Sequence, residues 1–185
     1  PEWATAAGGG ALTFIASGSF STASTVEITN MSSGYDVHRL VMPFQRPGSS
    51  GNNEVQFTMS TGSSYVTSNY HWGQLGGSSS TTSGNAQWEG HENTSSWGCY
   101  RDGGRADYSF MLDFHFVNFT NTGTGVYKSM YGDCHSVNVD ASTRFHANHL
   151  VGYNTNFTTA VDGLKITPSS GTLTGNYYWY GIKRS

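Results

Sequence analysis

Charged side chains are scarce in this sequence. Asp, Glu, Lys and Arg make up 11% of the 185 residues, against about 25% in a typical globular domain. The nine Lys and Arg residues are spread along the chain, and the formal net charge is −3. Proteins that bind nucleic acid use clustered cations to displace counterions from the phosphates. The composition therefore argues against nucleic acid as a partner.

Long apolar runs and cysteines are also few. No stretch approaches the ~20 apolar residues that a membrane-spanning helix needs, so membrane insertion is not expected. The two cysteines, Cys99 and Cys134, are too few for a disulfide framework and lack the spacing of a zinc site. Two buried thiols and a single disulfide between them are both compatible with the sequence.

Helical periodicity is missing as well, because no segment of helical length repeats its apolar residues every 3.6 positions. The chain has instead 24 glycines and 14% aromatic residues. Apolar residues alternate with polar ones over short runs that end in turn residues, which predicts about nine or ten strands. Such a series indicates one all-β domain, a sandwich or barrel. We place this domain at 11–185, after a glycine-rich linker or N-terminal arm at 1–10.

The strand pattern is regular outside one segment. Pro43 is expected to end the third strand. Between the fifth and sixth strands, 73–107 is rich in Gly, Ser, Thr and Asn and predicts a long variable insertion, with short strands at 86–89 and 96–100. The predicted strands are 12–16, 26–29, 35–42, 54–60, a strand beginning at 70–72, 108–119, 126–137, 143–153, 163–167 and 173–183.

Two strands carry enough large side chains to predict their faces. In 108–119, one face is a core-facing row of Phe110, Leu112, Phe114 and Phe116. In 173–183, the alternation predicts a core face and an outward face. The core face is Tyr178, Tyr180 and Ile182, and the outward face is Tyr177, Trp179 and Gly181. Packing of Trp179 under a long loop is the alternative.

Histidine and aspartate lie near the centres of the three strands between 108 and 153. If these strands form a meander with symmetric turns, His115 lies opposite Met130 and Asp133 lies opposite His146. We therefore expect an ion pair between Asp133 and His146, of about 0.2–1 kcal/mol.

The same register predicts no metal site within one chain. It puts His115 and His149 on either side of Met130, about 9.6 Å apart, because neighbouring strands are about 4.8 Å apart. Zinc ligands converge at about 2.0–2.3 Å from the ion. We therefore expect no metal and no cofactor; the alternative is a site on the symmetry axis of an oligomer, to which each chain contributes one histidine.

No constellation of catalytic groups stands out. The chain lacks a Gly-x-Ser-x-Gly elbow, a nucleophile with a paired base, and a glycine-rich phosphate loop. A glycosidase needs two carboxylates that flank a cleft. Glu89 and Glu92, with His91 between them, suit sugar hydroxyls better than bond cleavage. We expect a binding protein and no enzyme, with a glycan-cleaving enzyme as the least favoured alternative.

The segment 73–107 suggests what is bound. Aromatic rings stack on the apolar faces of sugars, and carboxylate, imidazole and guanidinium groups bond the hydroxyls. An ordered loop that makes subunit contacts is the alternative reading of this segment, and Trp72 could equally be a core residue. The candidate glycan or receptor residues are Trp72, Trp88, Glu89, His91, Trp97, Tyr100, Arg101, Asp102 and, from the last strand, Trp179.

Distinctive motifs lie near both ends of the chain. They are PEWATAAGGG at 1–10, STVEITNM at 24–31, YDVHRL at 35–40, VDGLKI at 161–166 and GNYYWYGIK at 175–183. Together these motifs resemble the C-terminal domain of bacteriophage tail-fibre and virion structural proteins. The first is similar to the junction that follows the repeats of longer fibres, the next two to the first paired strands of the terminal domain, and the last two to its closing hairpin. The similarity frames the domain over roughly half the chain and leaves 73–107 unmatched.

The resemblance implies a jelly-roll-like antiparallel β-sandwich, often assembled as a homotrimer, on the exterior of the phage particle. It implies a tail-fibre domain that binds a host surface receptor, for which a glycan is the expected chemistry. The N-terminal segment would join other virion proteins. A capsid decoration, cement or head-fibre protein is the main alternative. The resemblance carries over no catalytic residue.

Overall fold

The computed structural model describes residues 12–29, 31, 34–46, 54–62, 64–79, 84–99, 108–123, 125–138, 144–155 and 158–183. Over these ranges the chain is all-β, and every strand pairing is antiparallel. The same ranges contain no helix with the length and hydropathy to cross a membrane. The predicted all-β class and antiparallel sandwich-like layering are confirmed.

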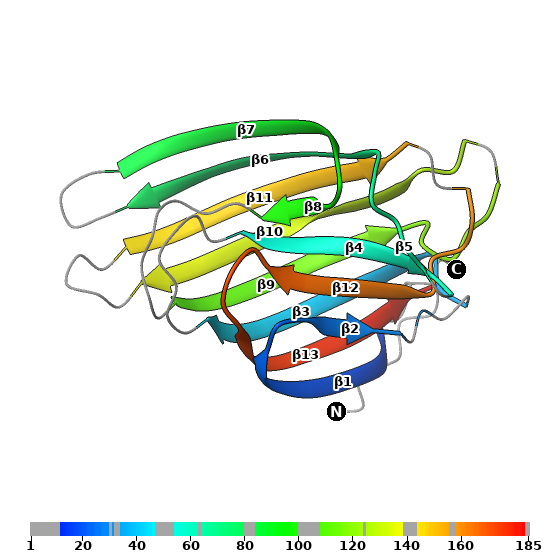
Figure 1. The fold of residues 1–185 in the computed structure, drawn as a ribbon, viewed down its shortest axis with the longest axis horizontal. Coiled ribbons are helices and arrows are strands. Elements are labelled where there is room, and N and C mark those ends of the chain that lie inside the picture. Colours follow the sequence, from blue (N-terminus) through cyan, green and yellow to red (C-terminus); the bar gives the residue numbers. More distant parts are fainter. Residues whose placement is uncertain are drawn as a thin grey trace, which may run out of the picture.

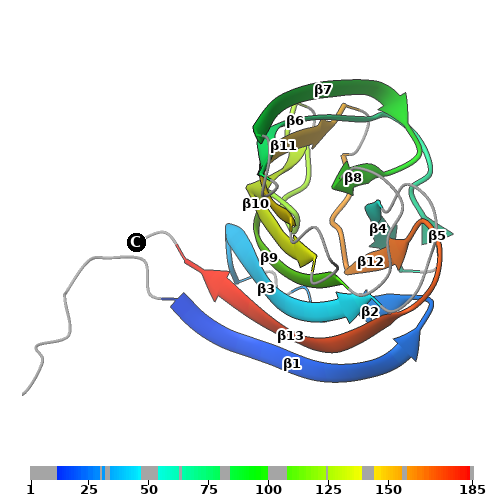
Figure 2. The ribbon, with the colours of Figure 1, turned by 90° about the vertical axis from the view of Figure 1, so that its left-hand side faces the viewer.

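The strands form two sheets that face each other (Figure 1). Figure 2 shows the larger sheet curling around the smaller one. The larger sheet has eight strands, in the order β1 (Leu12–Ala23), β13 (Leu173–Ile182), β3 (Val37–Arg46), β9 (Tyr108–Val117), β10 (Lys128–Asn138), β11 (Arg144–Asn154), β6 (Tyr70–Ser79) and β7 (Gly84–Thr94). The smaller sheet has the order β2 (Val26–Ile28), β12 (Gly163–Pro168), β4 (Val55–Thr61) and β5 (Ser64–Tyr65), with β8 (Trp97–Cys99) also paired to β4.

The core lies between the sheets. Phe57 of the smaller sheet packs edge-on against Phe114 of the larger sheet, with ring centroids 5.3 Å apart. The row predicted for β9 is confirmed, because Phe110, Leu112 and Phe116 are buried along with Phe114. Burial of large apolar side chains contributes roughly 1.5–3 kcal/mol each, so this row is a main source of stability.

The prediction for the faces of β13 is wrong. Trp179 is fully buried and stacks on His38, with centroids 5.2 Å apart and planes 13° apart, whereas Tyr178 is exposed. Both faces of β13 carry aromatic rings, so alternation alone gives no preference. Gly181 distinguishes the two faces. It lies on the same face as Trp179, and the ring of Tyr35 packs closely over it.

The register predicted for the central meander is also wrong. Asp133 pairs with Asp113 on one side and His149 on the other, and His115 lies opposite Tyr131. The observed β10–β11 register differs from the predicted one by three residues. The turn of this hairpin lies later in the chain than predicted, because the pairing continues as far as Asn138↔Arg144. The ion pair is therefore made to His149, whose Nδ1 lies 2.9 Å from Asp133 Oδ1, and not to His146.

The prediction that Pro43 ends its strand is wrong. β3 continues through Pro43 to Arg46, and Pro43 pairs with Met111 of β9. On the other side, the pairing between β3 and β13 skips Met42 and Pro43. A proline has no N–H to donate, so the break in this ladder accommodates it within a central strand.

The described part of the segment 73–107 is built into the sandwich. It supplies most of β6, all of β7 and all of β8. β7 is much longer than the strand predicted at 86–89, because it pairs with β6 from Ser79↔Gly84 to Tyr70↔Thr94. This hairpin makes one edge of the larger sheet, and it carries the site described next.

Candidate functional site

The outer face of the larger sheet, which points away from the smaller sheet, is unusually apolar. Among the described residues, all the exposed large apolar side chains lie on this face or, for Tyr127, directly before β10. They are Leu12, Phe14, Leu75, Trp88, Met111, Tyr127, Tyr131, Val137, Phe145, Val151, Tyr153 and Tyr178. A contiguous exposed apolar surface usually marks a place of contact.

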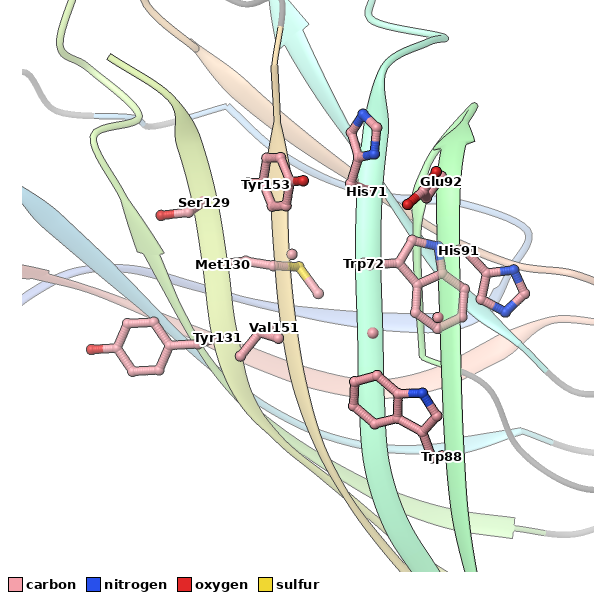
Figure 3. A pocket seen from close by; sticks show the side chains of 13 residues that line it. His71, Trp72, Trp88, His91, Glu92, Ser129, Met130, Tyr131, Val151 and Tyr153 are labelled. Atoms are coloured by element: carbon pink, nitrogen blue, oxygen red, sulfur yellow. The ribbon is translucent and has the colours of Figure 1, made fainter. Parts of the chain in front are cut away.

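A groove of about 620 Å³ crosses this face near the β7 edge (Figure 3). It passes over four neighbouring strands, β7, β6, β11 and β10. Gly73 and Gly90, which pair directly across β6 and β7, form a part of its floor that has no side chains. The groove is thus an opening in the row of outer-face side chains.

Trp88 stands at one side of the groove and is 71% exposed. It pairs across the strands with Leu75, which is also exposed, and its ring leans over Gly73. A Cβ atom added at Gly73 would lie 3.5 Å from this ring, whereas one added at Gly90 would meet nothing within 4 Å. Trp88 therefore covers Gly73 and offers its exposed ring beside the open floor at Gly90.

Trp72 and His91 pair across β6 and β7 directly beside Gly73 and Gly90, so their side chains point to the other face of the hairpin, toward the smaller sheet. Their rings stack with centroids 4.2 Å apart and planes 18° apart, and Trp72 is buried. His91 Nε2 lies 3.9 Å from Glu89 Oε2, and Glu89 accepts a hydrogen bond of 3.0 Å from Gln74 Nε2. These contacts support the hairpin from behind the groove floor.

Glu54, directly before β4, lies next to this Trp72–His91 stack. A Cβ atom added at Gly98 would clash with both the Glu54 carboxylate and the Trp72 ring, which shows how closely these groups pack. Burial raises the pKa of Glu54, and a hydrogen bond from Gln56 opposes that shift. Glu54 does not line the groove.

Two stacked pairs of histidine and tyrosine lie at the rest of the groove, and all of their rings except His115 belong to its lining. His71 stacks on Tyr153 with centroids 5.0 Å apart, and His115 stacks on Tyr131 with centroids 4.9 Å apart; both pairs are within 8° of parallel. Each pair joins two adjacent strands, since His71↔Tyr153 and His115↔Tyr131 are cross-strand partners. The pairs present rigid apolar rings with polar tips.

The charges near the groove are mostly paired with one another. Arg39 forms a two-point ion pair with Asp113, and Asp133 contacts His149. Burial lowers the pKa of His115, which the Asp113 carboxylate opposes. Of the described residues that line the groove, Glu92 is the one with a formal charge at neutral pH if histidine is neutral. The groove is weakly acidic and has no lysine or arginine among these lining residues.

Of the residues predicted from the sequence, Trp88 places its ring in the groove, whereas the side chains of Trp72, Glu89 and His91 cluster on the opposite face of the same hairpin. Two others must be corrected, because Trp97 and Trp179 are fully buried in the core and do not reach the surface. Trp97 packs edge-on against Tyr70 and lies over Gly152. Tyr100, Arg101 and Asp102 lie outside the described residues.

Sequence reasoning missed half of the groove. His71, Tyr131, Val151 and Tyr153 line it from β6, β10 and β11. Alternation along the meander could have placed the last three on the outer face. Their proximity to Trp88 could not be predicted, because these residues are far from Trp88 in the sequence and come near it through the pairing of β11 with β6.

Within the described ranges, no group of three or more His, Cys, Asp or Glu side chains is placed to hold a metal ion. Comparison with known protein families, curated proteins and solved structures gives no significant match for this chain.

Proposed function

We propose that this chain is a binding domain of a bacteriophage virion, exposed on the particle as the C-terminal domain of a tail fibre, and that the outer-face groove binds a glycan of the host surface. The phage assignment rests on the resemblance of both ends of the sequence to such domains. The glycan assignment rests on the groove. The observation that supports it is the exposed ring of Trp88 beside the open floor at Gly90.

The chemistry of the groove suits a sugar. A pyranose ring needs an aromatic face on which its C–H groups can stack and polar groups that bond its hydroxyls. Trp88 and the Tyr153–His71 pair supply faces, while Glu92, Ser129 and the tyrosine hydroxyls supply polar contacts. The site is concave and largely preformed by strands, as ligand sites usually are.

Binding without cleavage is part of the proposal. Glycoside hydrolysis needs two carboxylates on opposite sides of the scissile bond. Among the described lining residues, Glu92 is the single carboxylate. Glu89 is held by Gln74 beside the groove and does not line it.

The assembly is also proposed. By resemblance we infer a jelly-roll-like sandwich that forms a homotrimer, with the segment 1–10 as its connection to other virion proteins. Light scattering of the purified chain is expected to give the mass of three chains. A monomeric mass would contradict the proposed trimer but would not bear on the proposed glycan site.

The glycan site is tested with two exposed aromatic positions on the same face. Trp88→Ala is expected to weaken binding to host cells and to extracted surface glycans at least about tenfold, since buried aromatic anchors dominate binding energy. Phe145→Ala is the matched control, because Phe145 is exposed on the same face but does not line the groove. Unchanged binding by Trp88→Ala, with both variants folded by circular dichroism, would count against the site.

A structural role is the second candidate, and one observation favours it. Exposed apolar side chains extend over the whole outer face, from Leu12 and Phe14 on β1 to Trp88 on β7. A capsid decoration, cement or head-fibre protein would bury such a face against other subunits. Locating the chain in a map of the virion distinguishes this candidate from a tail-fibre tip.

A further inference from the structure

We propose that the groove is selective for neutral, unbranched oligosaccharides that lie across the strands, and that the open floor at Gly90 determines this selectivity. The inference rests on the proposed glycan-binding function. It adds the class of glycan and the residue that leaves the space for it.

The direction of the groove sets the length of its ligand. The groove crosses β7, β6, β11 and β10, which are consecutive neighbours in the sheet. Three spacings of about 4.8 Å give a length of about 14 Å. A single sugar ring would leave much of this length empty, so the geometry fits a short chain of sugars.

The floor sets the width. On β7, Gly90 lies between Trp88 and Glu92 at alternate positions, and on β6, Gly73 lies between Leu75 and His71. Alternate residues of a strand point to the same face. Gly90 is therefore a gap, one side chain wide, between Trp88 and Glu92, while Gly73 leaves room for the Trp88 ring to lean over it. A linear chain fits this gap with its rings against Trp88, whereas a branch would meet a wall.

The charge sets the class. Glu92 gives the lining a negative charge at neutral pH, and no lysine or arginine is among the described lining residues. The nearby guanidinium of Arg39 is occupied by Asp113. A chain bearing carboxylates or sulfates would be repelled without compensation, so neutral sugars are favoured.

Gly90 provides a clean test because an added Cβ meets nothing within 4 Å. Gly90→Val is expected to fold and to fill the floor with a branched side chain. Ala86→Val is the matched control: Ala86 is an exposed residue of the same strand and face, and it lies outside the groove. Thermal unfolding of both variants should stay close to that of the wild type.

The experiment measures the affinity of the three proteins, by calorimetry, for neutral linear oligomers of glucose and of N-acetylglucosamine and for acidic oligomers of galacturonic acid. For the wild type, we expect affinity for a neutral oligomer to rise from one sugar to four and to exceed that for the acidic oligomers. Gly90→Val is expected to lose about tenfold or more of this affinity, a change of the size caused by losing one good contact. Ala86→Val is expected to keep it.

The outcomes separate the two proposals. If the wild type binds no glycan, both proposals fall. If it binds glycans through Trp88 but prefers the acidic oligomers, or if Gly90→Val binds as well as the wild type, then the selectivity proposed here is overturned and the glycan-binding function stands.

Discussion

Arg39 and Asp113 form an ion pair across β3 and β9 on the outer face of the larger sheet. Arg39 Nε donates to Asp113 Oδ1 at 2.8 Å, and Nη2 donates to Oδ2. The hydrogen bonds from the guanidinium hold the pKa of Asp113 below its usual range, although partial burial opposes this. Asp113 also pairs across the strands with Asp133, so Arg39 offsets the repulsion between two carboxylates.

This pair predicts a pH-dependent part of the stability. Because the pKa of Asp113 is lower in the folded chain, its stabilisation is present above the unfolded value of about 3.9. It is lost as the pH falls through the folded value. Asp113→Asn is expected to lower the free energy of unfolding near pH 7 by less than about 1 kcal/mol, since the pair is partly solvated. Urea titrations should show that the difference from the wild type shrinks toward pH 2. A difference that stays constant over this range would contradict the assignment.

The corrected face of β13 gives a second prediction. Trp179 is fully buried against His38 and Phe116, so Trp179→Ala should cost about 3–5 kcal/mol. Tyr178→Ala, one residue away on the exposed face, should cost less than about 1 kcal/mol. Guanidinium denaturation of the two variants is the measurement, with Trp179→Phe as a milder change if the alanine variant does not fold. Equal losses at the two positions would mean that the face is assigned wrongly.

The contrast between β9 and β13 shows which parts of the fold could be predicted. In β9, four large apolar residues alternate with smaller or polar ones, so a period of two identifies the core face. In β13, Tyr177 and Trp179 compete with Tyr178 and Tyr180 for the core. Which of the two faces is buried depends on contacts with Tyr35 and His38, which come from elsewhere in the chain.

The groove could be predicted only in part, for a related reason. Trp72, Trp88 and His91 come from one hairpin, and their aromatic and polar composition marks that segment in the sequence. Tyr153 and Val151 line the groove together with Trp88 because β11 pairs with β6. A pairing between strands about 70 residues apart leaves no local pattern, and the register errors in the meander show that turn geometry is equally hard to infer.

Tyr70 gives a third prediction, on a buried hydrogen-bonded link. Its hydroxyl accepts from the Met59 N–H at 2.9 Å and donates to the Val66 carbonyl at 3.1 Å, and burial raises its pKa. Tyr70→Phe keeps the ring and leaves both backbone groups without this partner. The expected loss of stability is about 1–3 kcal/mol, measured by thermal or urea unfolding. Tyr65→Phe, whose hydroxyl bonds to an exposed Glu27, is the control and should lose less.

The two cysteines give the last prediction. Cys99 lies on β8 of the smaller sheet and Cys134 on β10 of the larger sheet, and both are free, buried thiols. Burial raises the pKa of Cys99, and hydrogen bonding with Cys134 acts in the same direction. Because the thiolate is the reactive form, the native chain should react with a thiol reagent at pH 8 far more slowly than the urea-unfolded chain, which should release both thiols without reduction. An unfolded, unreduced chain that releases none would show instead that a disulfide joins the two sheets. In that case, reduction should lower the stability of the folded domain.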